Sequence, residues 1–446
     1  MKKLLNRGPT LNTRTVLEIV RKYSLDSAGV EVTSLGGLKK IGGQNCVLIT
    51  LPNGDQLLID CGKIVGDDNF EKEKASLYPN FDAINFDRLV AVVLSHGHYD
   101  HILAIPKLLE LRGEREIPLL ILATPVTFVV LEKVLANAGY KADQLSKLTT
   151  FQLLNDQQSI GRFKIEAYPV IHSIPGSVCL VIEACKKRIM YLSDFKWMRN
   201  NWIEYSEAQV LFEKLARTNI DLLLMDSTNA KMEGQTPSVT RTRATFERIL
   251  TAEKYKDRRI IIAMFSSAFE DASDIAIAAN ELGGRQCSCR GVAMSFFFDL
   301  FGVLGDQSHY ADGQEVIFVT GGQAEKTAVL NKASLGQSDW LELQPSDVVI
   351  IASNPIPGND VNIELMVSRI KTIGCEVITT KESPEIHVSG HEMIDGLKRA
   401  TETIQPQRLM PIHGDRPSRV QLGKAVHSTN PELDVLIVSD NEPIVI

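Results

Sequence analysis

One short loop of the sequence concentrates side chains that bind metal ions. The chain has 446 residues and nine histidines, and three of these histidines lie with an aspartate in S-H-G-H-Y-D-H, Ser95 to His101. The apolar run L-V-A-V-V-L directly before the loop predicts a strand buried on both faces, and I-L-A-I-P-K-L-L-E-L, from Ile102, predicts an amphipathic helix. We therefore expect the loop at the end of a sheet, between a buried strand and a helix.

The four candidate ligands of the loop fall into two pairs. Neutral imidazole is the commonest nitrogen ligand of zinc, and carboxylate oxygen binds zinc as well. His96 and His98 alternate along the chain and can point to one ion, whereas Asp100 and His101 project to a neighbouring point. Two adjacent ions would use all four groups. A solvated polar loop with incidental histidines is the alternative interpretation, and the pattern H-x-H-x-D-H behind a buried strand argues against it.

Two ions need more ligands than this loop supplies. Three further strand-like runs end in a suitable group, at His172 in Y-P-V-I-H-S, Asp194 in I-M-Y-L-S-D-F and His413 in R-L-M-P-I-H-G-D. A single histidine after a strand is more often structural than a metal ligand. Together, however, the three residues complete two coordination shells.

The composition fits a large globular protein. Hydrophobic residues make up 44% and charged residues 23% of the chain, which is ordinary usage. No apolar run has membrane-spanning length, the first residues do not form a signal peptide, and the seven cysteines show no disulfide framework. We therefore expect a cytoplasmic protein without membrane contact. The net charge of −7 argues mildly against non-specific nucleic-acid binding but leaves room for a local basic channel.

The pattern of strands and helices changes twice along the chain. Up to about residue 230 short β-rich runs and turns dominate, and then helical segments alternate with buried runs such as R-I-I-I-A-M, which predicts a parallel sheet. After about residue 370 short strands return, beginning with C-E-V-I-T-T. We predict that residues 1–229 and 371–446 form one larger domain and that residues 230–370 form an α/β domain inserted into it.

The motifs resemble those of a known superfamily. H-x-H-x-D-H, a lone histidine, the aspartate of S-D-F and a late histidine resemble the metallo-β-lactamase superfamily, and D-C-G, Asp60 to Gly62, is similar to its D-x-G turn beneath the metals. L-L-M-D-S-T-N-A, T-G-G-Q-A-E, I-P-G-N, H-V-S-G-H and P-I-H-G-D resemble the beta-CASP nucleases and, among them, the ribonuclease J family. The similarity runs from about Leu35 to the last strand. It implies an α/β fold, namely an αββα sandwich with an inserted parallel-sheet beta-CASP domain.

The resemblance also implies a role for each motif residue. The implied metal ligands are His96, His98 and His172 for the first ion, Asp100, His101 and His413 for the second, and Asp194 as a bridge. Asp226 would orient a metal-ligating histidine, and His391 would face the scissile phosphate. The chemistry would fall to Asp100, Asp194, Asp226 and His391. The residues that would line the nucleotide phosphate pocket are Ser266, Ser267, His387, Ser389, Gly390 and His391.

Four places depart from the family's pattern. Ala268 stands where an asparagine is usual, Glu270 where a histidine is common, Lys39 and Lys40 where an acidic residue is frequent, and H-G-D replaces H-G-E. These changes spare the metal ligands and affect the substrate pocket. The chain also ends soon after the last predicted strands, so we expect a short form without the C-terminal domain of many bacterial relatives.

The resemblance implies a ribonuclease that uses two divalent ions. We expect zinc, with manganese as the alternative, and single-stranded RNA with a 5′-monophosphate as the substrate. Cleavage would run from 5′ to 3′, with endonuclease action as a second mode, in a cytoplasmic homodimer. Two other functions stay open. One is a nuclease of single-stranded DNA, which Ala268 and the acidic net charge keep in play, and the other is a catalytically silent subunit for RNA binding or assembly.

Overall fold

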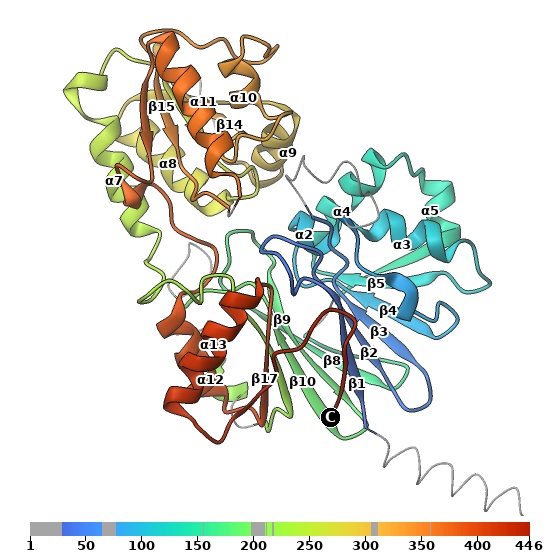
Figure 1. Cartoon of the computed structure of the whole chain (residues 1–446). Helices are drawn as coiled ribbons and strands as arrows, with labels where there is room; N and C mark the ends of the chain where they lie inside the picture. Colours follow the sequence, from blue (N-terminus) through green and yellow to red (C-terminus); the bar gives the residue numbers. More distant parts are fainter. Residues whose placement is uncertain are drawn as a thin grey trace, which may run out of the picture.

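The structure is a computed structural model of the chain, in which three sheets and their helices are defined (Figure 1). The residues that it describes are 29–64, 77–154, 156–197, 210, 212–215, 218–304, 311–356 and 358–446. None of the helices in these ranges is both long and apolar enough to span a bilayer.

Two seven-stranded sheets pack face to face in the larger domain. The first has the strand order β19 (Pro443–Val445), β1 (Glu31–Gly36), β2 (Cys46–Thr50), β3 (Gln56–Ile59), β4 (Leu89–Val93), β5 (Leu119–Ala123) and β6 (Thr149–Leu153). The second has the order β18 (Asp434–Val435), β17 (Arg408–Ile412), β11 (Leu222–Asp226), β10 (Lys187–Leu192), β9 (Val178–Ala184), β8 (Phe163–Pro169) and β7 (Gln157–Ile160). Because successive side chains of a strand point to opposite faces, one face of each sheet supplies a shared core, in which Ile49 and Leu180 are both fully buried.

Helices cover the outer faces of both sheets. On the first sheet lie α2 (Tyr99–Ile102), α3 (Ile105–Arg112), α4 (Pro125–Asn137) and α5 (Ala142–Leu148), and on the second lie α12 (Ile394–Ile404) and α13 (Arg416–Thr429). Leu108 of α3 shares a core with Val92 of β4, and Leu397 of α12 shares another with Leu223 of β11. The predicted αββα sandwich is confirmed, and β4 is the buried strand expected before the histidine loop.

The inserted domain is built on a five-stranded sheet in which every neighbouring pair is parallel. Its strand order is β13 (Arg285–Arg290), β14 (Ala311–Val319), β12 (Ile260–Ala263), β15 (Val348–Ile351) and β16 (Glu376–Thr379). The helices around it are α7 (Thr240–Leu250), α8 (Phe269–Glu281), α9 (Val292–Phe301), α10 (Val329–Ser334) and α11 (Asp360–Ile373). The short 3-10 helices η4 (Glu253–Tyr255) and η5 (Pro384–Ile386) also pack in its core, whereas η3 (Phe81–Ala83) belongs to the sandwich. Apolar cores on both faces of the sheet confirm the expected parallel α/β insert.

One strand lies in a different sheet from the one expected. The run C-E-V-I-T-T, placed with the returning strands of the larger domain, forms β16 and pairs in parallel with β15 of the insert. The inserted sheet therefore continues to Thr379, past residue 370. The backbone N–H and C=O groups along one side of β15 offer an edge for a parallel strand, and this pairing rather than sequence position decides where β16 lies.

Helix α9 joins the two domains through adjacent phenylalanines. Phe297 is 2% exposed and packs in the core between the first sheet and its helices, whereas Phe298 is 3% exposed and packs in the core of the insert. Each aromatic ring removes a large apolar area from water. The insert is thus anchored on the sandwich next to the histidine loop.

Candidate metal centre

The candidate ligands lie where strands end at one edge of the sandwich. Strands β10, β11 and β17 run parallel to one another, and β8 runs in the same direction because β8 and β10 both pair antiparallel with β9. The residues that follow or close these strands are His172 after β8, Asp194 after β10, Asp226 in β11 and His413 after β17, and they face His96 after β4. The structure therefore brings together ligands that are far apart in the sequence.

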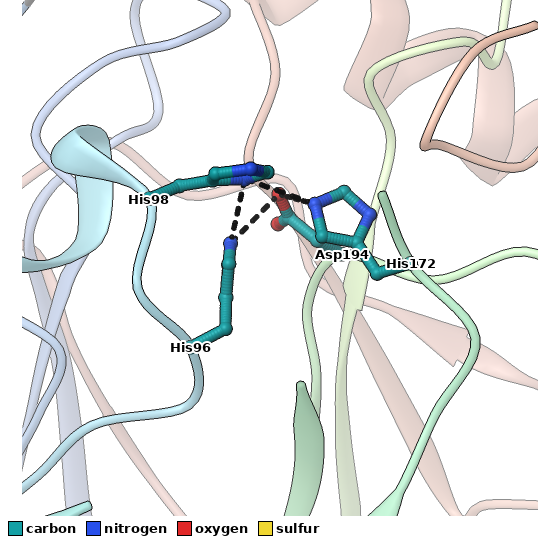
Figure 2. Close-up of side chains that lie close together, drawn as sticks. All are labelled: His96, His98, His172 and Asp194. Atoms are coloured by element: carbon teal, nitrogen blue, oxygen red, sulfur yellow. Dashed lines mark hydrogen bonds and ion pairs between the residues drawn. The ribbon is translucent and has the colours of Figure 1, made fainter. Parts of the chain in front are cut away.

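Three imidazoles and one carboxylate form the first cluster (Figure 2). His98 Nδ1 lies 3.1 Å from His96 Nε2 and 3.0 Å from His172 Nε2. Asp194 Oδ2 is 3.4 Å from both of these Nε2 atoms. In Figure 2 the four side chains reach toward a common point, His96 and His98 from one loop and His172 and Asp194 from two other segments.

The second cluster lies on the other side of Asp194. It consists of Asp100, His101 and His413, and His413 Nε2 is 3.2 Å from Asp100 Oδ2. Asp194 Oδ1 is 3.3 Å from both His101 Nε2 and His413 Nε2. Asp194 therefore turns one oxygen to each cluster, which is the arrangement of a carboxylate that bridges two ions.

The hydrogen bonds around the first cluster determine which ring nitrogens carry hydrogen. The hydroxyl of Ser95 donates to Asp60 Oδ2 at 2.7 Å, so its oxygen accepts from His96 Nδ1 at 3.0 Å. His172 Nδ1 donates to the carbonyl of Gly390 at 2.8 Å. The Nε2 atoms of both histidines therefore carry no hydrogen, and their lone pairs point into the cluster, as in metal-ligating imidazoles.

The second cluster follows the same rule. His101 Nδ1 donates to Asp60 Oδ2 at 2.7 Å. Thr228 donates its hydroxyl hydrogen to Asp226 Oδ1 at 2.7 Å and accepts from His413 Nδ1 at 2.8 Å. The Nε2 lone pairs of both histidines then point at carboxylate oxygens. Such a set of converging lone pairs is stabilised by cations, so the residues present fit divalent metal ions.

The pKa values of the histidines agree with this geometry. Burial lowers the pKa of His96 and His172, and it lowers the pKa of His98 to about 3, so these rings are neutral, the form that binds metals. Burial acts in the same direction on His101 and His413, but nearby carboxylates, Asp194 first among them, outweigh it and raise their pKa. The second cluster thus favours positive charge.

His391 lies beside both clusters without belonging to the histidine loop. Its Nδ1 is 2.9 Å from Asp226 Oδ2 and its Nε2 is 3.7 Å from Asp194 Oδ2. Burial opposes its protonation, but the carboxylates of Asp226 and Asp194 raise its pKa to about 9. Asp226 contacts His391 directly and reaches the ligand His413 through Thr228. It therefore orients two histidines, and one of them, His391, forms a third group of possible metal ligands with Asp194 and His413.

Comparison with known proteins places the chain in a family. Residues 56–252 match the beta-lactamase superfamily domain, and residues 257–370 match the beta-CASP domain of ribonuclease J. Ribonuclease J of Mycobacterium tuberculosis (strain CDC 1551 / Oshkosh) is 30% identical over 436 residues, which cover 94% of this chain and 74% of that protein. This chain belongs to the ribonuclease J family.

Other relatives extend the comparison. The ribonuclease J of Mycoplasma genitalium is 27% identical over 86% of this chain and 68% of that protein. The ribonuclease J of Helicobacter pylori (strain B128) is 28% identical over 99% of this chain and 65% of that protein. A crystal structure of a protein of unknown function from Enterococcus faecalis V583 superposes with a TM-score of 0.64 at 18% identity, covering 94% of this chain, and supports the fold. Membership of the superfamily implies use of divalent metal, which the two clusters can hold.

The residues expected in the phosphate pocket lie in two parts of the chain, the segment His387 to His391 and the loop before α8. Ser389 Oγ accepts from Asn229 Nδ2 at 2.9 Å, and Gly390 approaches His172 so closely that a side-chain carbon there would lie 2.8 Å from the ring. Both therefore lie beside the first cluster. Ser266 and Ser267 lie in the loop before α8 of the insert. His387 Nδ1 lies 3.5 Å from Asp271 Oδ2 of α8, where the two elements meet.

Several residues of the centre were missed in the sequence. Asp60, noted only as part of the turn, accepts from Ser95, His101 and Tyr191, the last at 2.8 Å. Asn45 donates to Asp100 Oδ2 at 3.3 Å. Ser95 and Thr228 lie within two residues of motif residues, which is a usable signal. Nothing in the sequence singles out Tyr191 or Asn45, because their roles depend on which strands become neighbours.

The departure H-G-D has a structural explanation. Asp415 is the N-cap of α13, and its Oδ1 accepts from Ser418 N at 2.8 Å. Its Oδ2 lies 3.1 Å from Lys231 Nζ. A short acidic side chain suits an N-cap, so this aspartate acts on the helix rather than on the metal centre.

Proposed function

We propose that this chain is a ribonuclease that depends on two divalent metal ions and hydrolyses single-stranded RNA from the 5′ end, with endonucleolytic cleavage as a second mode. The observation that carries the proposal is the position of Asp194. Its two oxygens face separate clusters at 3.3 Å and 3.4 Å, so one side chain can hold two ions side by side. Two adjacent ions are a recurrent arrangement in nucleases.

The first ion would be held by His96, His98, His172 and Asp194, and the second by Asp100, His101, His413 and Asp194. Zinc suits this mixture of imidazole and carboxylate, with manganese as the alternative. When bound, the ions would acidify water and stabilise charge on the phosphoryl oxygens. The homodimer and the cytoplasmic location expected from the sequence stay predictions.

The other roles belong to side chains of this chain. Asp226 holds Nδ1 of His391, so that Nε2 of His391 faces the centre. From there it can donate a hydrogen bond to the phosphoryl group or a proton to the leaving oxygen. Asp60 holds His101, Ser95 and Tyr191 together beneath the clusters, which keeps the ligands in position before substrate arrives.

The direction of cleavage requires recognition of an RNA end near the ions. The place for it is the junction of the α8 loop with the segment His387 to His391. The family resemblance predicts a 5′-monophosphate at this end, bound by Ser266, Ser267, His387, Ser389 and Gly390. The buried charges at this junction bear on which 5′ group is accepted.

The test is cleavage of single-stranded RNA by metal-loaded protein. RNA labelled at either end is incubated with zinc or manganese, beside His98→Ala protein and a sample with chelator. We expect mononucleotides from the 5′ end, and we expect their release to stop in the variant and with chelator. If metal-replete protein leaves RNA with either type of 5′ end intact, the proposal is wrong. Cleavage of a matched DNA strand alone would favour the DNA nuclease instead.

A further inference from the structure

A second group of buried charges lies at the start of α8, and we name it the α8 cluster. It consists of Lys196, Glu270, Asp271, Asp274 and His387. Lys196 is 2% exposed, and the three acidic residues are 1%, 5% and 4% exposed. Lys196 Nζ lies 3.1 Å from Glu270 Oε2. Lys196 belongs to the sandwich and Glu270 to the insert, so this ion pair crosses between the two domains.

The α8 cluster borders the ligands of the first ion. Lys196 lies two residues after Asp194, and its backbone N–H donates to the carbonyl of Ile171, next to His172, at 2.8 Å. His387 begins the segment in which the carbonyl of Gly390 holds His172. An RNA end adjacent to the scissile bond would therefore meet this cluster.

The balance of charge in the cluster is negative. Three carboxylates face one ammonium group, which is already paired with Glu270, and the imidazole of His387, which lies 3.5 Å from Asp271 Oδ2. Even with His387 protonated the carboxylates outnumber the cations. Arg243 of α7, which Asp274 also attracts, lies 3.0 Å from Glu247 on its own helix. Among the described residues, Glu270 Oε1 and Asp271 Oδ1 are buried and have no hydrogen-bond partner. Within the same described ranges, His387 Nδ1 is also without a hydrogen-bond partner and lies 3.5 Å from the other oxygen of Asp271. Two buried carboxylate oxygens thus remain that can accept a hydrogen bond from a ligand.

The helix start strengthens this argument. The N-terminus of a helix attracts anions, phosphate included. In α8 the first turn carries Glu270 and Asp271, so the protein's own carboxylates occupy that favourable position. A phosphate carries about −1.5 to −2 charge at pH 7 and offers mainly acceptors. It would therefore meet both like charge and the wrong hydrogen-bonding groups.

We propose that the α8 cluster makes this ribonuclease select RNA with a 5′-hydroxyl end over RNA with a 5′-monophosphate. A 5′-hydroxyl is a donor, and it can satisfy Glu270 Oε1 or Asp271 Oδ1 without adding charge. The inference rests on the proposed ribonuclease activity and specifies the end that this activity accepts. Glu270 and Asp271 are then the residues that determine specificity.

The test compares two RNAs of one sequence that differ only in the 5′ group. Burial raises the pKa of Glu270 to about 7, although Lys196 lowers it, so the assay is run at pH 8, where this carboxyl is ionised. We expect kcat/KM to be at least about tenfold higher for the 5′-hydroxyl RNA, because opposing like charges costs more than that in binding. Glu270→Gln is expected to bring the two values closer together.

Glu281→Gln is the matched control. It removes one carboxylate from the other end of the same helix, where the side chain is 63% exposed. The ratio of the two kcat/KM values is expected to stay as in the wild type. If Glu270→Gln does not fold, Asp271→Asn serves the same comparison. An equal or higher kcat/KM for the 5′-monophosphate RNA in the wild type would overturn the proposal, as would a ratio that Glu270→Gln leaves unchanged.

Binding separates this inference from the proposed activity. The same two RNAs, labelled with a fluorophore at the 3′ end, are titrated with full-length His98→Ala protein and followed by anisotropy. Tighter binding of the 5′-hydroxyl RNA supports the inference even if no RNA is cleaved by wild-type protein, in which case only the proposed activity fails. Equal or tighter binding of the 5′-monophosphate RNA overturns the inference even if cleavage is seen.

Discussion

The metal centre and the α8 cluster are neighbours that handle buried charge in opposite ways. In the metal centre, the second ring nitrogen of four of the five candidate ligand histidines is held by Ser95, Gly390, Asp60 or Thr228, and only that of His98 lacks a partner among the described residues. The lone pairs of these four rings therefore face inward, where cations would stabilise them. In the α8 cluster, acidic oxygens of Glu270 and Asp271 are buried without such partners. Buried charge is costly unless it is paired or bound to metal. The metal centre is therefore suited to cations, whereas the α8 cluster keeps buried acidic oxygens that a hydrogen-bond donor at an RNA end would satisfy.

The strongest way to break this comparison is to remove the charge shared by both ions. Asp194→Asn keeps the size of the side chain but removes the bridge, so we expect ribonuclease activity to fall by about a thousandfold, equivalent to several kcal/mol. Bound metal, measured on the dialysed protein by elemental analysis, should fall with it. Asp143→Asn, on the exposed face of α5, is the control. Full metal content and activity in Asp194→Asn would show that the bridge is not needed.

Removing a charge from the α8 cluster should not harm the protein but should raise its free energy of unfolding. Burial raises the pKa of Glu270 from 4.5 to about 7. The unfolded chain therefore loses this proton at lower pH than the folded chain, and the free energy of unfolding falls as pH rises from about 4.5 to about 7. Above that window the cost reaches about 3 kcal/mol. Glu270→Gln should thus stabilise the protein at pH 8 and change little at pH 4.5 or below.

Thermal unfolding of both proteins at the two pH values measures this difference. The titration of the metal-centre histidines is common to both proteins and cancels in the comparison. Glu281→Gln should leave the unfolding temperature within error of wild type at either pH. A lower unfolding temperature for Glu270→Gln at pH 8 would mean that the pair with Lys196 outweighs burial, and the contrast between the two clusters would disappear.

A smaller effect is expected at the residue that orients His391. Asp226→Asn weakens the hydrogen bond to His391 Nδ1 and the link through Thr228 to His413, and loss of such an orienting carboxylate costs about 10–100-fold. We expect kcat of Asp226→Asn to fall by this factor, while the variant retains most of its bound metal. If Asp226→Asn loses both ions instead, Asp226 supports the ligands more than it supports His391. Metal analysis beside steady-state kinetics distinguishes the two roles.

The sequence reveals the candidate ligands because their signal is local. H-x-H-x-D-H follows a buried strand, and His172, Asp194 and His413 each follow an apolar run, so the convergence could be anticipated without knowing how strands pair. The contact of Tyr191 with Asp60 could not be anticipated, because it spans 131 positions of the sequence and forms only where the two sheets of the sandwich pack face to face. Lys196 and Glu270, 74 positions apart, meet only because the insert docks on the sandwich.

The fold shows the same limit. The sandwich and the parallel insert follow from hydrophobic patterns and from the family resemblance, but β16 was placed with the wrong group of strands. A strand of only four residues, E-V-I-T, carries no mark of the sheet that it joins. Pairing with β15 supplies that information, and it exists only in three dimensions. The same holds for α9, whose successive phenylalanines serve the cores of two domains.

The smallest effect should come from an acidic residue that lies next to the metal centre and takes no part in it. Asp415 follows His413 closely but caps α13 through Ser418 N. Asp415→Ala should lower the free energy of unfolding by about 1 kcal/mol, the usual value of an N-cap, whereas Asp415→Asn should restore most of it. Metal content and kcat should match the wild type in both variants. If Asp415→Asn keeps the cap but loses metal, this carboxylate belongs to the metal centre. The group of residues that bind the ions would then be larger than the seven candidate ligands.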